Sequence, residues 1–253
     1  MILGKNWLYV SLIAALAILL IPTTHVSAVV QWSDDFNDAN YSNWVVIEGE
    51  WSAENNSLQV SGGTPVGCNL DVFPGIIYHE SLVTTGTWSF DLEYDLSLAE
   101  EAAIPKFFFM SADPSAWEGY CIEVQPVIIG DRLIAAFRLL RATSTPGIVG
   151  VQYTILGSYD VDEGTTGNNH VDITRTAEGQ MTVWIDGSQA IQATDTVIDA
   201  DSCDSFVVFS NLGWAFDNVV VDNAITIGQF PLILGTASAL VVVVVIVPYV
   251  RRR

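Results

Sequence analysis

The 253-residue chain combines a mean hydropathy of +0.38 with a formal net charge of −20, and only 15% of its residues are charged. Half of its residues are hydrophobic and 11% are aromatic, and this composition excludes a disordered chain. It also argues against nucleic-acid binding, because recognition of phosphates needs a basic surface.

The charge is distributed unevenly along the chain. All 29 acidic residues lie between Asp34 and Asp222. The same segment contains five basic residues, so its net charge is −24. The two ends of the chain are apolar, and the only charged residues in them are basic. The sequence therefore predicts an acidic central domain between two hydrophobic segments.

Residues 1–28 have the features of a secretory signal peptide. Lys5 precedes an apolar stretch over 7–21, and Val26-Ser27-Ala28 places small residues at the cleavage positions. We expect cleavage after Ala28, because the apolar stretch is short for a membrane span. An uncleaved N-terminal anchor is the alternative.

The second apolar segment predicts a transmembrane helix over 225–250. Residues 230–250 contain no charge, and at about 1.5 Å per residue this stretch reaches about 31 Å, enough to cross the hydrocarbon core. Three arginines at 251–253 predict a cytoplasmic tail, with residues 29–224 outside the cell. The expected protein is a single-pass protein of the cell membrane, and a buried core helix is the alternative.

The central segment, 29–224, is predicted to be one all-β domain. Polar and apolar residues alternate over 87–96, and 171–176 and 181–186 read as two strands of a hairpin. Asp186-Gly187 predicts a tight turn, and two more strands are expected over 205–210 and 216–221. The composition of 132–142 suits a helix as well as a strand. This density of strands favours a two-sheet sandwich.

Several motifs resemble those of concanavalin A-like and laminin-G-like jelly-roll domains, the superfamily of lectins and glucanases. They are the opening segment 32–38 (WSDDFND) with Trp44, Gly49, Trp51 and Ser57-Leu58, the hairpin strand 181–187 (MTVWIDG) and the closing strand 216–221 (FDNVVV). The resemblance implies a two-sheet antiparallel jelly roll whose last strand returns beside the first. It supports the fold more than any function.

The resemblance also raises the question of hydrolysis, because laminarinase-type glucanases present Glu, Asp and Glu at alternate positions of one strand. The nearest match is Glu93-Tyr94-Asp95-Leu96-Ser97-Leu98, where Ser97 replaces the third carboxylate. A glycosidase needs two carboxylates that flank the scissile bond. We therefore predict no catalytic residues and no enzymatic activity, and interpret this segment as a solvated strand face.

Calcium is the metal that the acidic domain would suit, because it prefers oxygen ligands. In jelly rolls of this type an acidic site often joins the first and last strands, and the resemblance implies Asp35 and Asp217, with Asp34 and Asn37 as helpers. Rival clusters are Asp160/Asp162 and Asp199/Asp201/Asp204. The alternative is that a domain with 29 acidic residues contains such clusters by chance.

Sugar binding would need exposed aromatic rings, and three lie near Gly or Pro outside clean alternation: Trp117, Tyr120 and Trp214. A structural role is the alternative for each. The other tryptophans in patterned segments, Trp44, Trp51, Trp88 and Trp184, are expected to pack in the core or between the sheets.

Covalent features of an exported protein are also predicted. Cys68, Cys121 and Cys203 permit one disulfide and one free thiol in three alternative pairings, and a covalent dimer stays open. Asn40 and Asn55 begin acceptor patterns for N-glycosylation. Three functions remain: a lectin-like surface module for adhesion or nutrient capture that binds a glycan or a surface protein, a structural envelope protein, and a divergent glycan hydrolase.

Overall fold

A computed structural model describes residues 30–62, 66–68, 71–73, 75–97, 104–114, 117–144, 150–161, 164–210 and 212–223. The predicted signal peptide, transmembrane helix and arginine tail lie outside these residues. In the described part of the chain, no helix has the length and hydrophobicity to cross a membrane.

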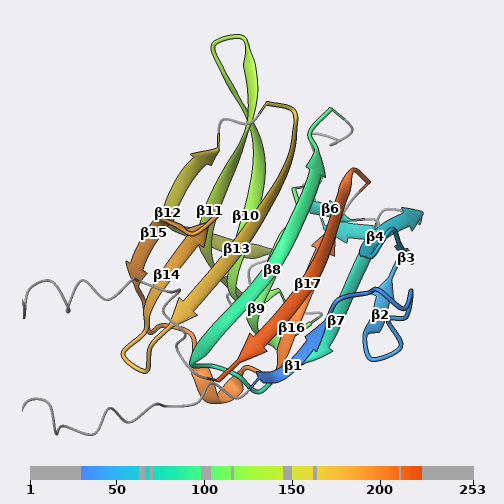
Figure 1. The fold of residues 1–253 in the computed structure, drawn as a ribbon. Coiled ribbons are helices and arrows are strands. Elements are labelled where there is room, and N and C mark those ends of the chain that lie inside the picture. The colour runs from blue at the N-terminus through green and yellow to red at the C-terminus, as the bar shows by residue number, and fades with distance from the viewer. Residues whose placement is uncertain are drawn as a thin grey trace, which may run out of the picture.

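Two antiparallel sheets form the two layers of the molecule, one at the front and one at the back of Figure 1. The front sheet consists, in spatial order, of β15 (Ser188–Thr194), β14 (Gln180–Ile185), β13 (Thr166–Arg175), β8 (Gly86–Asp95), β17 (Trp214–Asp222), β4 (Ser57–Gly62) and β3 (Glu50–Glu54), and β1 (Val30–Asp34) also pairs with β17. The back sheet consists of β12 (Val151–Val161), β11 (Arg132–Ser144), β10 (Glu118–Ile129), β9 (Lys106–Asp113), β16 (Ser205–Ser210), β7 (Gly75–Glu80) and β2 (Val45–Glu48). A short hairpin of β5 (Val66–Cys68) and β6 (Asp71–Phe73) and one 3₁₀ turn, η1 (Ala200–Ser202), complete the described elements. The prediction of an all-β sandwich is confirmed.

The core lies between the two sheets and follows from the period-two pattern of the strands. On β8, Trp88, Phe90, Leu92 and Tyr94 are buried, whereas the intervening polar residues lie on the opposite face. Each large apolar side chain that is fully buried stabilises the fold by about 1.5–3 kcal/mol.

Aromatic pairs connect the two layers. Phe90 on β8 stacks on Phe107 of β9 with a centroid separation of 4.9 Å, and Trp88 lies 5.1 Å from Phe109. Such ring pairs stabilise the fold beyond the contribution of the apolar area that they bury. The sheets are therefore held face to face by the residues that alternate inward.

The chain ends of the domain meet in one sheet, as expected from the jelly-roll resemblance. β1 pairs antiparallel with β17, so that Asp34 lies opposite Val219. Trp44, Trp51 and Trp88 are buried in the core, as predicted. Trp184 differs, because it is half-buried on the side of β14 opposite to the buried core residues.

Turn chemistry explains two hairpins. Asp186 and Gly187 connect β14 to β15 with φ values of 50° and 74°, the positive pair required by a type I′ turn. Asn55 and Asn56 connect β3 to β4 with φ values of 55° and 64°. The ambiguous segment 132–142 is a strand, β11, and it pairs with β10 and β12 over most of its length.

The cysteines only partly follow the expectation of a disulfide. Cys203 is buried in the core between the sheets and has a free thiol, so the two pairings that involve it are not formed. Cys121 is buried in a separate cluster on the outer side of the back sheet. The side chain of Cys68 lies outside the described residues.

The Cys203 thiol is expected to resist alkylation in the folded protein. Burial raises the pKa of Cys203 to about 11, so that the reactive thiolate is scarce at neutral pH. Peptide mapping after iodoacetamide treatment should show Cys203 unlabelled under native conditions and labelled after denaturation. Rapid native labelling of Cys203 would contradict this environment.

Candidate functional site

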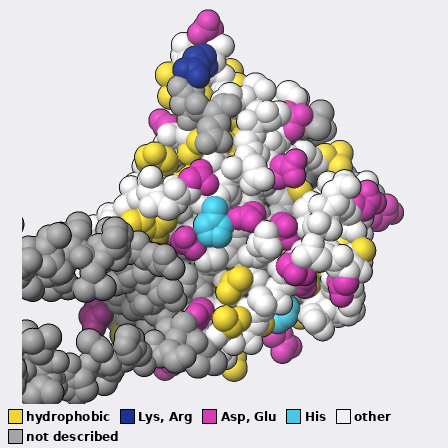
Figure 2. Space-filling view, viewed as in Figure 1, with side chains coloured by type: hydrophobic (Ala, Val, Ile, Leu, Met, Phe, Trp, Pro, Cys, Tyr) yellow, Lys and Arg dark blue, Asp and Glu magenta, His cyan; other side chains and the backbone are white. Residues whose placement is uncertain are grey.

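The outer face of the front sheet is polar and acidic. Ser89, Asp91, Glu93 and Asp95 alternate on the outer side of β8, because the intervening residues of this strand are buried. Figure 2 shows acidic side chains spread over this face, whereas Lys and Arg side chains are visible only near its top. The face is therefore a surface of negative potential.

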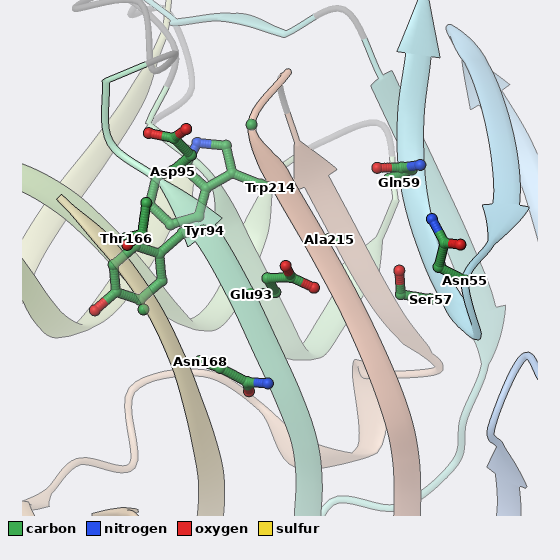
Figure 3. A pocket seen from close by; sticks show the side chains of 12 residues that line it. Asn55, Ser57, Gln59, Glu93, Tyr94, Asp95, Thr166, Asn168, Trp214 and Ala215 are labelled. Atoms are coloured by element: carbon green, nitrogen blue, oxygen red, sulfur yellow. The ribbon is translucent and has the colours of Figure 1, made fainter.

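A groove of about 570 Å³ lies at one end of this face. Twelve residues from β4, β8, β13, β17 and the adjoining turns line it (Figure 3): Asn55, Ser57, Gln59, Glu93, Tyr94, Asp95, Thr166, Gly167, Asn168, Gly213, Trp214 and Ala215. Its volume falls within the range of about 300–1,000 Å³ that is typical of small-molecule sites.

Polar side chains approach the groove from both sides. Figure 3 shows Glu93 between Gln59, which lies on β4, and Asn168, which lies on β13. Glu93 is exposed, and none of these three side chains has a hydrogen-bond partner within the described ranges. They are therefore available to a ligand as donors and acceptors.

Asp95 also lines the groove, but part of its hydrogen-bonding capacity is used. Its Oδ1 accepts bonds from the Ser97 amide at 2.9 Å and from the Ser97 hydroxyl at 2.5 Å. Ser97, which occupies the place of the missing third carboxylate, thus orients Asp95 at the end of β8.

Trp214 contributes an aromatic ring to the lining and packs on Tyr94, with ring centroids 5.5 Å apart. It is only 2% exposed, and its Nε1–H has no hydrogen-bond partner among the described residues. A buried donor without a partner costs about 1–3 kcal/mol. Trp214 and Tyr94 belong to the core cluster, on the side of the sheet opposite to Glu93, so the two rings support the groove from within the sandwich.

Close packing on the β13 side of the groove depends on a glycine. A Cβ at Gly167 would lie 2.3 Å from the Tyr94 hydroxyl oxygen, so a side chain at this position would collide with the ring. Gly167 therefore allows β13 to approach Tyr94, which in turn supports Trp214.

His170 lies on the same outer face, on β13 opposite Asp91 of β8. Its Nδ1 is 2.5 Å from Asp91 Oδ1, and its Nε2 is 3.3 Å from Asp172 Oδ1. Hydrogen bonds with Asp172 and Asp91 raise the pKa of His170 to about 9, although partial burial opposes them. Figure 2 shows a histidine between acidic side chains on this face.

Replacement of His170 by glutamine is expected to reduce stability in a pH-dependent way. The pKa of the folded protein, about 9, exceeds the ordinary value of 6.5, so the contribution is complete below pH 6.5 and is lost as pH rises through 9. The side chain is 45% exposed, and solvent screening limits the effect to about 1 kcal/mol. Urea unfolding at pH 6 and pH 10 measures it, and a difference between variants that does not change with pH would contradict the ion pairs.

The structure does not bring the three predicted aromatic ligand residues together. Trp117 is half-buried against Phe209 of the back sheet, with ring centroids 4.5 Å apart. Tyr120 lies in the core between the sheets, and only Trp214 lines the groove. The predicted group of Trp117, Tyr120 and Trp214 is therefore not one site.

Tyr120 must be corrected to a structural residue, because its side chain is fully buried. Its hydroxyl donates a hydrogen bond of 2.6 Å to Asp195 Oδ1 and accepts one of 3.3 Å from the Ile198 amide. Burial and the bond to Asp195 raise the pKa of Tyr120 to about 12. No part of its ring is available to a glycan.

The predicted calcium residues lie near one another where β1 pairs with β17. Asp34 accepts hydrogen bonds from the Phe36 amide at 3.1 Å and from Trp44 Nε1 at 2.9 Å. Hydrogen bonds from the Asn37 side chain and backbone amide lower the pKa of Asp35. The bond from the Asn37 backbone N–H to Asp35 Oδ1 is 3.2 Å long.

Asp217 belongs to the same neighbourhood. Burial raises the pKa of Asp217, and the charges of Asp91, Asp35 and Asp34 raise it further. In the described residues, however, no three His, Cys, Asp or Glu side chains are grouped to hold a metal ion. Calcium stays a prediction, and melting with calcium or a chelator tests it.

Other sequence candidates have structural roles or lie at the groove. Asp199 caps η1 by accepting a hydrogen bond of 3.1 Å from the Asp201 amide. Asn40 is exposed, and its Oδ1 accepts a bond of 2.9 Å from the Ser42 amide. Asn55 lines the groove, so a glycan attached there would lie at its edge.

A buried ion-pair network was not anticipated. On the back sheet, Lys106 Nζ is 3.5 Å from Glu123 Oε2, and Arg138 Nη1 is 3.5 Å from Glu123 Oε1. Lys106 is only 1% exposed. The sequence contained one signal for this network. The domain has few basic residues, and one of them is a lysine within the apolar run 104–109, which implies a buried acidic partner.

Comparison with known proteins supports the fold. No protein-family model matches the sequence, and a search of curated proteins finds no match. A structure from work on endo-acting O-glycanases, which members of the human gut microbiota express to initiate mucin breakdown, is 12% identical over 78% of this chain and 100% of its own, with a TM-score of 0.52. The laminarinase catalytic domain of Thermotoga maritima is 11% identical over 79% of this chain and 99% of its own, with a TM-score of 0.50. The chain thus has the same two-sheet, concanavalin A-like jelly-roll fold as these two structures.

Proposed function

We propose that this protein is a carbohydrate-binding module whose groove on the front sheet binds a saccharide. The observation that carries the proposal is the meeting of the Glu93, Gln59 and Asn168 side chains in one groove, where none of them has a hydrogen-bond partner among the described residues. A sugar hydroxyl both donates and accepts hydrogen bonds, so one saccharide can serve the acceptor Glu93 and the two amides.

The groove also suits an uncharged, hydroxyl-rich ligand in its composition. Ala215 lies between β4 and β8 in the lining, while amides, hydroxyls and carboxylates supply the groups that orient a ligand. The two similar structures are named for activity on glycans, which agrees with this ligand class.

We further propose that the module is displayed at the cell surface, exported by residues 1–28 and anchored by the helix over 225–250. Both segments are supported by the sequence alone: an apolar stretch behind Lys5, and 21 uncharged residues before three arginines. Fractionation of cells after protease treatment tests this topology, since only the domain over 29–224 should be digested from outside.

The binding function is tested with the full chain in detergent, produced in a host without N-glycosylation so that Asn55 stays unmodified. The protein is screened on a glycan array, and hits are measured by calorimetry for the wild type and for Asn168→Ala and Gln59→Ala. Each substitution should weaken binding about three- to tenfold, as expected for one lost hydrogen bond. Absence of binding to any saccharide would favour a structural envelope role instead.

Hydrolysis is the second candidate, and one observation favours it. Glu93 and Asp95 both line the groove and lie two residues apart on one strand, about 7 Å along its axis, within the range of carboxylate separations in glycosidases. We propose binding without turnover, because Ser97 stands where the alternation would need the third carboxylate and Asp95 is held by Ser97. Incubation of a bound oligosaccharide with the protein, followed by product analysis, decides between the two.

A further inference from the structure

We propose that the end of the sandwich that carries Leu82 and Val197 contacts the surface of a zwitterionic lipid bilayer, with the groove facing away from the membrane. This inference rests on the proposed anchoring of the chain by residues 225–250. It concerns which side chains of the domain meet the lipid.

Both ends of the described domain lie at the same end of the sandwich. β1 and β17 are antiparallel neighbours, and Val30 at the start of β1 lies opposite Asp222 at the end of β17. Figure 1 shows these two strand ends side by side at the bottom of the molecule. The chain therefore enters and leaves the sandwich at this end, so cleavage or retention of residues 1–28 leads to the same placement.

The predicted membrane segment begins close to this end. Asn223 follows β17, and the uncharged run over 230–250 begins seven residues later. An extended chain spans at most about 3.5 Å per residue, so this connection reaches no further than about 24 Å. The end of the sandwich with Asp222 is thus held near the bilayer.

The groove lies at the opposite end of the same sheet. β8 begins beside Asp222, which pairs with Thr87, and it ends at Asp95, which lines the groove. The ten residues of this strand span about 30 Å. When the end with Asp222 contacts the lipid, the groove therefore stands about 30 Å farther out and is open to ligands from outside the cell.

Two loops at the membrane end each expose one aliphatic side chain. Leu82, in the loop between β7 and β8, is 83% exposed, and Val197, which follows β15, is 63% exposed. The Ser81 amide donates a 2.7 Å hydrogen bond to the Asp204 carbonyl oxygen, which joins the first loop to the segment 195–204 that contains Val197. Both loops therefore belong to the end at which β8 starts and β17 stops.

Both loops are fixed on their inner side, so the two exposed side chains have defined positions. Val83, next to Leu82, is buried in the core between the sheets. Ile198, next to Val197, is also buried there, and its amide donates a 3.3 Å hydrogen bond to the Tyr120 hydroxyl. Side chains on loops that are already ordered lose little conformational freedom on contact, so the burial of their apolar surface in the lipid interface is favourable.

The charges of these loops determine which lipid they suit. Residues 80–85 and 195–204 contain no Lys or Arg. They carry four exposed carboxylates, on Glu80, Asp199, Asp201 and Asp204. An anionic leaflet repels such groups, whereas a zwitterionic surface does not. The partner that fits this end is therefore a zwitterionic bilayer.

Exposed apolar side chains alone do not select this end, which makes a matched control possible. Ile128, near the tip of the hairpin of β10 and β11, is 73% exposed. Figure 1 shows this hairpin at the top of the molecule, at the opposite end from the start of β1 and the end of β17. The position of the chain ends thus distinguishes Leu82 and Val197 from Ile128.

The test uses the full chain in phosphatidylcholine vesicles that contain lipids with a nitroxide at the headgroup. A fluorophore is attached to Leu82→Cys, Val197→Cys or the control Ile128→Cys, each combined with Cys68→Ser. Cys121 and Cys203 are buried and stay unlabelled. Flotation with the vesicles checks that each variant is anchored, and thermal unfolding checks that it is folded.

The labels at positions 82 and 197 should be quenched by the nitroxide, whereas the label at position 128, about 30 Å farther out, should not. Leu82→Asp should remove most of the quenching at position 197, because a charged side chain is costly to bury in the interface. Ile128→Asp should leave that quenching unchanged. Replacement of phosphatidylcholine by phosphatidylglycerol should also reduce it, because the acidic loops are repelled.

Equal quenching of all three labels, or of none, would show that the domain has no preferred orientation and would overturn the proposal. Quenching at position 197 that survives Leu82→Asp would assign the proximity to the chain connection alone and overturn the lipid contact. Each of these results leaves the anchor in place. Protein that does not float with the vesicles would instead refute the anchor, and this inference with it.

Discussion

Replacement of Asp195 by alanine is expected to lower the free energy of unfolding by about 3 kcal/mol. Asp195 accepts a 2.6 Å hydrogen bond from the Tyr120 hydroxyl and a 2.9 Å bond from the Val197 amide, and it forms an ion pair with Arg141. Its side chain is only 9% exposed. Loss of one partner of a buried ion pair costs about 3–5 kcal/mol, and the partial exposure of Arg141 places the effect at the lower end.

The reason for the large effect is the position of Asp195 between the layers. It follows β15 of the front sheet, whereas Tyr120 and Arg141 lie on β10 and β11 of the back sheet. The substitution leaves a buried hydroxyl and a guanidinium without their acceptor. Tyr120→Phe, which removes one hydroxyl only, should cost about 1 kcal/mol.

Thermal and urea unfolding measure this prediction. A loss of about 3 kcal/mol corresponds to a decrease in Tm of about 6–12 °C for a domain of this size. Asp160→Ala is the control, because Asp160 is an exposed strand residue, and its replacement should change stability by no more than about 0.5 kcal/mol. A decrease below 1 kcal/mol for Asp195→Ala would show that the two sheets do not depend on this contact.

Replacement of Trp214 by phenylalanine is expected to lower the free energy of unfolding by about 2 kcal/mol and to leave saccharide binding by the folded protein unchanged. The indole is 2% exposed and packs on Tyr94 in the core cluster. The smaller phenyl ring leaves a cavity, and the loss of buried apolar contacts destabilises the fold. Because the ring lies on the side of the sheet opposite to Glu93, the polar groups of the groove keep their positions.

A second tryptophan provides a matched comparison. Trp88 is also fully buried in the core cluster between the sheets, but it does not line the groove. Trp88→Phe makes the same chemical change and should lower the free energy of unfolding by a similar amount, also without a change in Kd. A selective loss of affinity in Trp214→Phe with full stability would show that the Trp214 ring contacts the saccharide and would contradict its place in the core.

Local patterns in the sequence were sufficient to predict several elements. The alternation over 87–96 corresponds to β8, and the hairpin over 171–186 corresponds to β13 and β14. Asp186-Gly187 forms the expected turn. These features depend on residues within about ten positions of one another. The alternation of buried and exposed residues and the residue types of a turn can therefore be recognised within a single segment.

Site residues were harder to predict, because their roles depend on distant contacts. The position of Tyr120 next to a glycine predicts a ligand residue, yet its hydroxyl donates a hydrogen bond to Asp195, 75 residues away. Glu93 was interpreted as part of a solvated strand face, and it does lie on such a face, but the groove around it was not visible. Segment 132–142 became a strand only because β10 and β12 pair with it on both sides.

The sequence by itself determined the acidic character of the domain, its β-rich class and the apolar segments at both ends, because composition and short-range periodicity are local properties. Tertiary structure alone decided where the groove lies. β17 pairs with β8 on one side and with β4 on the other, and this pairing sets Ala215 between Glu93 and Gln59. Such long-range pairing depends on the packing of the whole sandwich, since any strand of suitable pattern could in principle have taken that position.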